Sequence, residues 1–272
     1  MSDSQLVGLA EDFFQNSLDS SPTSAIMRGH KKYFDQIEEL TEEQFEKETE
    51  VVDTFIKRLN KIEKDNLTSK EKVTHGMLDF ALSSNKDSLL DRSWEFGAGV
   101  AGFTGFLIDY NQQMFIPDSE SADMMLKRFE LYKRLYTQIA EVQKVGLNNN
   151  RVATERNLLR TIDQLENYLA SSLDQDPLLL VNFSSEISGS EISEWKDKAK
   201  KIIEVNIRPT VSAYLDQLKT EHLPKGRGDD NCGIMWIDGG EESYLRSLRK
   251  YTGHKETTVK EVHEIGLSEI ER

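Results

Sequence analysis

Residues 121–145 read SADMMLKRFELYKRLYTQIAEVQKV, and this stretch decides the fold class. Its apolar side chains recur every three or four residues, which is the period of an α-helix and not of a strand. Gly146 follows directly, at a position where glycine commonly ends a helix. The stretch therefore predicts a long helix with one apolar face. That face consists of Met125, Phe129, Tyr132, Leu135, Tyr136, Ile139 and Val142.

A second long helix is predicted over about Arg151–Leu173, because Leu158, Ile162 and Leu165 keep the same spacing. Only residues 146–150 separate the two helices. A link this short places consecutive helices antiparallel, so the sequence predicts a helix hairpin.

Three capping boxes mark further helix starts. In such a box a Ser or Thr and a Glu or Gln three residues later satisfy backbone N–H groups at the helix N-terminus. The boxes begin at Thr41, Thr68 and Thr258. Apolar spacing predicts the remaining helices at about 4–18, 22–29, 190–203, 211–218 and 241–251, with Ser190 as a cap and Pro209 as a break. Together these segments predict an all-α, elongated multi-helix array.

Two segments depart from the helical pattern. Residues 83–120 are apolar, poor in charge and contain four glycines, so helix, buried loop and tight helix packing all fit them. Residues 223–240 form a predicted Gly-rich loop that contains the apolar island 234–237. The final helix, from Val259, is expected to bury Val262, Ile265 and Ile270 on one side and to leave its outward apolar side without a partner.

Composition excludes several classes of function. The chain has 272 residues and a formal net charge of −14, which disfavours nucleic acid and anionic membrane surfaces as partners. No apolar run approaches the roughly 18 residues that cross a bilayer, and no signal peptide is recognisable, so a cytoplasmic location is expected. The single cysteine, Cys232, excludes an internal disulfide.

Two motif matches fail on their chemistry. His263-Glu264 starts like the zinc-peptidase motif His-Glu-x-x-His, but Leu267 stands where the second histidine would be. Gly97-x-Gly99-x-x-Gly102 matches a dinucleotide-binding pattern, but no strand precedes it, as that mechanism requires. The sequence therefore predicts no metal site, no cofactor and no catalytic residue within this chain.

Residues 233–244, GIMWIDGGEESY, form the most informative candidate site. A Gly-rich apolar loop leads into a helix that starts near Glu241, and a helix N-terminus with an adjacent aromatic can hold a carboxylate or a peptide end. The alternative is that the loop only fills the core with Trp236. The residues alone leave both interpretations open.

This segment, together with Leu248–Thr252 and the run TTVKEVHEIGLSEI at 257–270, resembles the bacterial domain-of-unknown-function family 885. Ser21-Pro22-Thr23 also resembles the start of that family. The resemblance implies a helical relative of zinc peptidases whose metal-binding helix lies beyond the matched stretch, so zinc belongs to a portion that this chain lacks. It also implies that residues 1–272 form a single helical unit, the N-terminal part of a larger domain.

Two hypotheses for function follow. In the first, the chain is the non-metal-binding part of a metallopeptidase-like protein and contributes a cleft wall for a peptide substrate. Its binding residues are then Trp236, Gly239, Gly240, Tyr244 and His263. In the second, the chain is a stand-alone helical scaffold that binds a partner without catalysis. The oligomeric state stays open.

Overall fold

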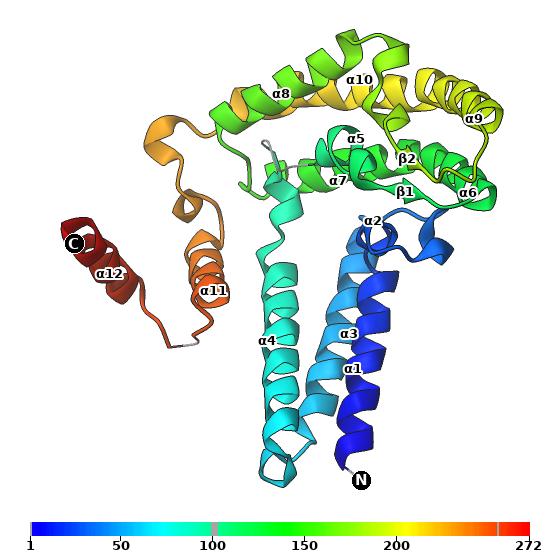
Figure 1. The fold of residues 1–272 in the computed structure, drawn as a ribbon. Helices are drawn as coiled ribbons and strands as arrows, with labels where there is room; N and C mark the ends of the chain where they lie inside the picture. Colours follow the sequence, from blue (N-terminus) through cyan, green and yellow to red (C-terminus); the bar gives the residue numbers. More distant parts are fainter. Residues whose placement is uncertain (1, 99–102, 255) are drawn as a thin grey trace. The chain divides into compact units, whose positions relative to one another are not determined.

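The computed structural model describes residues 2–98, 103–254 and 256–272 (Figure 1). Helices dominate this part of the chain, and the all-α prediction is confirmed. The α-helices are α1 (Ser2–Asp19), α2 (Pro22–Met27), α3 (Glu42–Asn60), α4 (Ser69–Asp91), α5 (Gly105–Ile108), α6 (Ser119–Glu130), α7 (Tyr132–Asn148), α8 (Glu155–Ala170), α9 (Gly189–Ile202), α10 (Arg208–Gln217), α11 (Gly240–Thr252) and α12 (Val259–Glu271). Two short strands, β1 (Phe115–Ile116) and β2 (Asn182–Phe183), pair in parallel.

The described chain divides into two compact units, each made of segments that are distant in sequence. The first unit comprises Met1–Gln15, Phe45–Ser93 and Cys232–Arg272. The second unit comprises Asn16–Gln44 and Trp94–Asn231. The last boundary between the units, after Asn231, falls inside the loop that the sequence predicts at 223–240.

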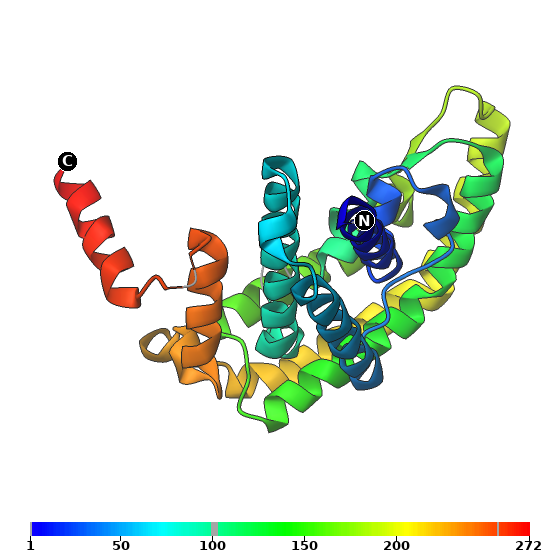
Figure 2. The ribbon, with the colours of Figure 1, turned by 90° about the horizontal axis from the view of Figure 1, so that it is seen from below.

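The first unit is built around α1, α3 and α4, which share a core of leucines and one phenylalanine. At the start of α4, Thr68 and Glu71 form the predicted capping box. Helix α11 lies alongside α4 in both views (Figures 1 and 2). The buried core residues are Leu6, Leu9, Phe55, Leu59, Leu67, Leu78 and Leu82.

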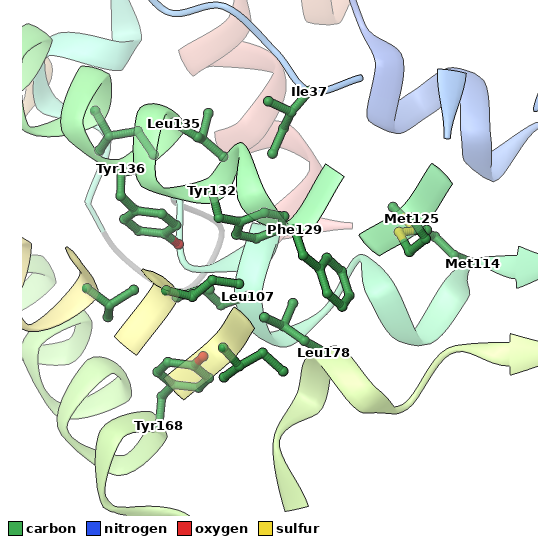
Figure 3. Close-up of a cluster of buried hydrophobic side chains, with 14 of the residues drawn as sticks. Ile37, Leu107, Met114, Met125, Phe129, Tyr132, Leu135, Tyr136, Tyr168 and Leu178 are labelled. Carbon is green, nitrogen blue, oxygen red and sulfur yellow. The ribbon is translucent and has the colours of Figure 1, made fainter. Parts of the chain in front are cut away.

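The second unit holds the larger core, shown in Figure 3. The apolar face predicted over residues 121–145 lies at its centre, and Phe129 and Leu135 are fully buried. The rings of Phe129 and Tyr132 meet edge to face, with centroids 5.8 Å apart. Helix α10 packs against both α7 and α8, the two helices of the predicted hairpin.

The structure corrects the boundaries of the first predicted helix. Residues 119–148 form two helices, because Leu131 has a ψ of −12°, which interrupts the regular helical path between α6 and α7. Gly146 does not end α7 but lies inside it. A Cβ at Gly146 would come within 2.6 Å of the Cβ of Glu95, so glycine there permits a close approach of two segments. The left-handed turn after the helix is formed by Asn150 instead, with a φ of 54°.

Two helix starts also differ from the predictions. Helix α8 begins at Glu155 and not at Arg151, and the side chain of Thr154 caps it by accepting from the Asn157 N–H. The predicted cap Ser190 lies inside α9, which Ser188 caps two residues earlier in a box with Glu191. In both cases the helix begins at the residue whose side chain reaches the free N–H groups.

The segment 83–120 combines structures that the sequence left open. Helix α4 continues through it to Asp91, and a 3₁₀ turn follows at Ser93–Phe96. Of the glycine pattern, Gly97 lies in a described loop, while Gly99 and Gly102 lie outside the described residues. Later in the chain, Pro209 sits in the first turn of α10 directly after a π-helical turn, Ile203–Ile207. The chain stays helical here, and only the α-helical hydrogen-bond pattern changes.

The final helix, α12, is correctly placed but its burial is not as predicted. Ile265 is 59% exposed and Ile270 is 83% exposed, and no residue of α12 is buried among those described. The apolar side of α12 therefore lacks a covering element within the described chain. None of the helices described here is both long enough and apolar enough to cross a membrane.

Candidate functional site

The segment 233–244 folds into a tight corner between a 3₁₀ turn, η11 (Ile234–Trp236), and helix α11. The N–H of Gly240 donates to the Ile237 carbonyl at 2.9 Å, which closes the corner. Gly239 has a φ of 71°, a left-handed conformation that suits glycine because it has no Cβ. The two glycines of the candidate site thus determine how the chain turns.

The aromatic side chains of this corner face outward. Trp236 is 51% exposed and Tyr244 is 45% exposed, whereas Ile237 is only 4% exposed. The interpretation that Trp236 fills the core is therefore wrong, since Ile237 occupies the buried position. Half-exposed aromatic rings on a fixed backbone offer apolar surface and a polar edge to a ligand.

Helix α11 begins without a side-chain cap, and Glu241 and Glu242 occupy its first turn. The first N–H groups of a helix have no acceptor within the helix, so they can donate to a carbonyl oxygen placed beside them. The two carboxylates lie at the positive end of the helix dipole, where negative charge is stabilising, and they give this end of the corner negative charge.

Polar contacts hold α11 against α4 in the first unit. The Arg246 Nε donates to the Asp91 carboxylate at 2.5 Å, and Lys250 Nζ donates to Ser88 Oγ at 3.3 Å. Since Arg246 precedes Lys250 while Asp91 follows Ser88, the two helices run antiparallel. Arg246 and Asp91 are each less than one-fifth exposed, so this ion pair is partly screened from water.

His263 is not brought into this corner by any contact that the structure defines. It is exposed on α12, downstream of the confirmed Thr258 capping box. Beside it lies an open hollow of about 640 Å³ lined by His254, Glu256, Thr257, Glu261, Glu264, Ile265 and Ser268, and not by His263. The Glu261 carboxylate takes part in the helix cap and accepts hydrogen bonds from the backbone and side chain of Thr258. These hydrogen bonds hold the pKa of Glu261 below its usual range.

A groove that the sequence analysis missed lies between α4 and α11. It has a volume of about 400 Å³ and combines apolar, acidic, basic and hydroxyl side chains from three helices. The only sequence signal is the spacing of Asp79, Ser83 and Asp87, which places polar groups on one face of α4. Nothing in that spacing reveals that α11 forms the opposite wall. The lining residues are Ile56, Gly76, Asp79, Phe80, Ser83, Ser84, Lys86, Asp87, Arg249, Lys250 and Gly253.

The family resemblance implies a zinc ion, but the described residues contain no group of side chains that could bind it. Across residues 2–98, 103–254 and 256–272, no three side chains of His, Cys, Asp or Glu gather into a group that could hold a metal ion.

The fold and the corner define an all-α protein in which a glycine-locked turn presents two aromatic side chains. Residues 22–272 match the family model described as "Bacterial protein of unknown function (DUF885)", and the chain belongs to this family. The predicted family resemblance is thereby confirmed. No curated protein matches the sequence at a significant level.

One solved structure confirms the fold independently. It is that of a "putative lipoprotein" from Colwellia psychrerythraea, with a TM-score of 0.80 and 17% sequence identity. The alignment covers 100% of this chain and 50% of the other, so the chain spans about half the length of that structure. At this identity the likeness concerns the fold alone.

Proposed function

We propose that the chain is the N-terminal, non-metal-binding part of a metallopeptidase-like protein, in which the corner of Trp236, Gly239, Gly240 and Tyr244 forms one wall of a peptide-binding cleft. The observation that carries the proposal is the half exposure of Trp236 and Tyr244 on a backbone that the two glycines lock. The match of residues 22–272 to the DUF885 family model is compatible with this role.

The chemistry of the corner suits an extended peptide. Trp and Tyr rings provide large contact areas and lose little conformational entropy on binding, because each has only two side-chain torsions. The N-terminal turn of α11 supplies N–H donors for a peptide carbonyl, and Glu241 and Glu242 favour a basic side chain nearby. His263 remains a predicted contact on α12.

The test uses a peptide blocked by an acetyl group and an amide, so that free ends play no part. The peptide is an extended decamer rich in leucine and lysine, titrated while tryptophan emission is recorded. Trp195 is 4% exposed, so the half-exposed Trp236 is well placed to report contact. Saturable binding is expected, and Tyr244→Ala should weaken it about tenfold. Trp236→Ala removes the reporter, so its affinity is measured by calorimetric titration, where a loss of about tenfold is expected as well.

Tyr251 provides a matched control, since it lies on the same helix, is 87% exposed and does not belong to the corner. Tyr251→Ala should leave the affinity unchanged. Equal losses in Tyr244→Ala and Tyr251→Ala would show a non-specific effect of aromatic surface and would refute the cleft wall. Adding His263→Ala to the series tests whether α12 contributes.

A second candidate function, a scaffold that binds a protein partner without catalysis, is favoured by the exposed apolar side chains of α12. Under that hypothesis the chain should self-associate or bind through Ile265 and Ile270, and blocked peptides should not bind the corner. Light scattering of the wild-type chain and of Ile265→Ser/Ile270→Ser separates the two candidates.

A further inference from the structure

The lining of the α4–α11 groove includes two apolar side chains. Phe80 on α4 is 46% exposed, and Ile56 on α3 is half-buried beside it. A volume of about 400 Å³ lies within the range of about 300–1,000 Å³ that small-molecule sites occupy. The groove can thus hold a ligand of a few apolar groups with polar ends.

The α11 wall carries positive charge that protein carboxylates do not neutralise. The Arg249 Nε donates to the Leu245 carbonyl at 3.2 Å, and Lys250 donates to a serine hydroxyl. Within the described ranges neither side chain forms an ion pair. A guanidinium with free forked nitrogens matches the geometry of a carboxylate.

The α4 wall carries the opposite charge. Asp79, Ser83 and Asp87 are spaced four residues apart, so they follow one stripe of the helix over about 12 Å. The third cation of the lining, Lys86, is paired with Asp53 at 2.5 Å and adds little net charge. The groove therefore presents cations on the α11 wall and carboxylates on the α4 wall, and its lining also includes the apolar side chains of Phe80 and Ile56.

We propose that the α4–α11 groove binds a short apolar peptide with both ends free. The ligand carboxylate pairs with Arg249 and Lys250, the ligand ammonium pairs with Asp87, and an apolar side chain packs on Phe80. This site is separate from the Trp236–Tyr244 corner and does not depend on the function proposed for that corner.

Calorimetric titration with leucyl-leucine tests the site on the intact 272-residue chain. Wild-type protein should bind it, and Arg249→Gln should weaken binding at least tenfold, the loss expected for a hydrogen bond to a charged group. Leucyl-leucine amide lacks the carboxylate, so it should bind weakly and equally to wild type and Arg249→Gln. Arg160→Gln, which removes an exposed arginine on α8 in the second unit, is the matched control.

The ammonium end is tested separately with Asp87→Asn and N-acetyl-leucyl-leucine. Asp87→Asn should weaken leucyl-leucine but leave the acetylated peptide unaffected, and this second variant keeps the test valid if Arg249→Gln fails to fold. No binding to wild type at millimolar peptide, or equal affinities of wild type, Arg249→Gln and Asp87→Asn, would overturn the proposal. Trp236→Ala should bind leucyl-leucine like wild type, which separates this site from the corner.

Discussion

Gly240 lies directly against the peptide group of Ile234, and a Cβ at position 240 would come within 2.7 Å of the Ile234 carbonyl carbon. Real Cβ atoms do not approach backbone so closely, so only glycine lets η11 fold back onto the first turn of α11. This contact explains why the corner depends on a residue without a side chain.

Gly240→Ala is expected to destabilise the first unit by about 1–3 kcal/mol, because the new methyl group forces the backbone of Ile234 to move. Gly266→Ala is the control, since a Cβ there meets nothing within 4 Å and alanine favours the helix. Hydrogen exchange of the α4 and α11 amides measures the effect. Unchanged exchange in Gly240→Ala would contradict the tight corner.

Leu135→Ala should lower the free energy of unfolding of the second unit by about 2–5 kcal/mol, because Leu135 is fully buried and the deletion leaves a cavity. In a Trp236→Phe background, the remaining Trp94 and Trp195 both report on the second unit during urea unfolding. Leu159→Ala on α8, where the side chain is 48% exposed, should cost well under 1 kcal/mol. Similar losses of stability in the two variants would mean that Leu135 does not lie on the buried face of α7.

Arg208→Met tests the buried ion pair between Arg208 and Asp176. Asp176 is fully buried and accepts from Arg208 Nε at 3.2 Å and from Nη2 at 3.0 Å. Removing the arginine leaves a buried carboxylate without its cation, so a loss of about 3–5 kcal/mol is expected in urea unfolding.

The comparison for Arg208→Met is Arg156→Met, whose partner Asp229 is 76% exposed. A surface pair of this kind contributes about 0–1 kcal/mol because water screens it. If both variants unfold at the same urea concentration, the buried Arg208–Asp176 pair contributes no more to the stability of the fold than the exposed pair does.

The low pKa of the Asp118 carboxyl, at the start of α6, predicts that the stability of the folded state depends on pH. Hydrogen bonds from Lys31 and from Ser121 lower the pKa of Asp118 from 3.8 to about 2. A carboxyl whose folded pKa is depressed stabilises the folded state above its unfolded pKa, and this contribution is lost as the pH falls from about 4 towards 2. The NMR titration of the Asp118 carboxyl carbon should therefore have its midpoint near 2.

Lys31→Gln should move that midpoint upwards, because it removes the largest cause of the shift. Lys198→Gln, which breaks an exposed pair on α9, should leave it in place. A midpoint that is the same in wild type and Lys31→Gln would exclude the Lys31 contact in solution.

The sequence by itself determined the helical class and most helix starts. Thr68, with Glu71, and Thr258, with Glu261, were recognisable because a capping box involves only residues three apart, so the interaction is already present in the local chain. Likewise, the spacing of Phe129 and Leu135 predicted the face that is buried, since apolar side chains on one side of a helix need a partner. The family resemblance at 233–270 was also readable from residues close together in sequence.

Only the tertiary structure decided which glycines are structural and where polar groups converge. Gly146 looked like a helix end, but it lies inside α7 because Glu95, about fifty residues earlier, approaches it. Sequence alone left both a core and a surface position open for Trp236, and the structure places Ile237, not Trp236, in the buried position. The groove joins α4 to α11, elements separated by about 150 residues in sequence. Such contacts depend on how distant helices pack, and helical periodicity constrains only which face of each helix is available.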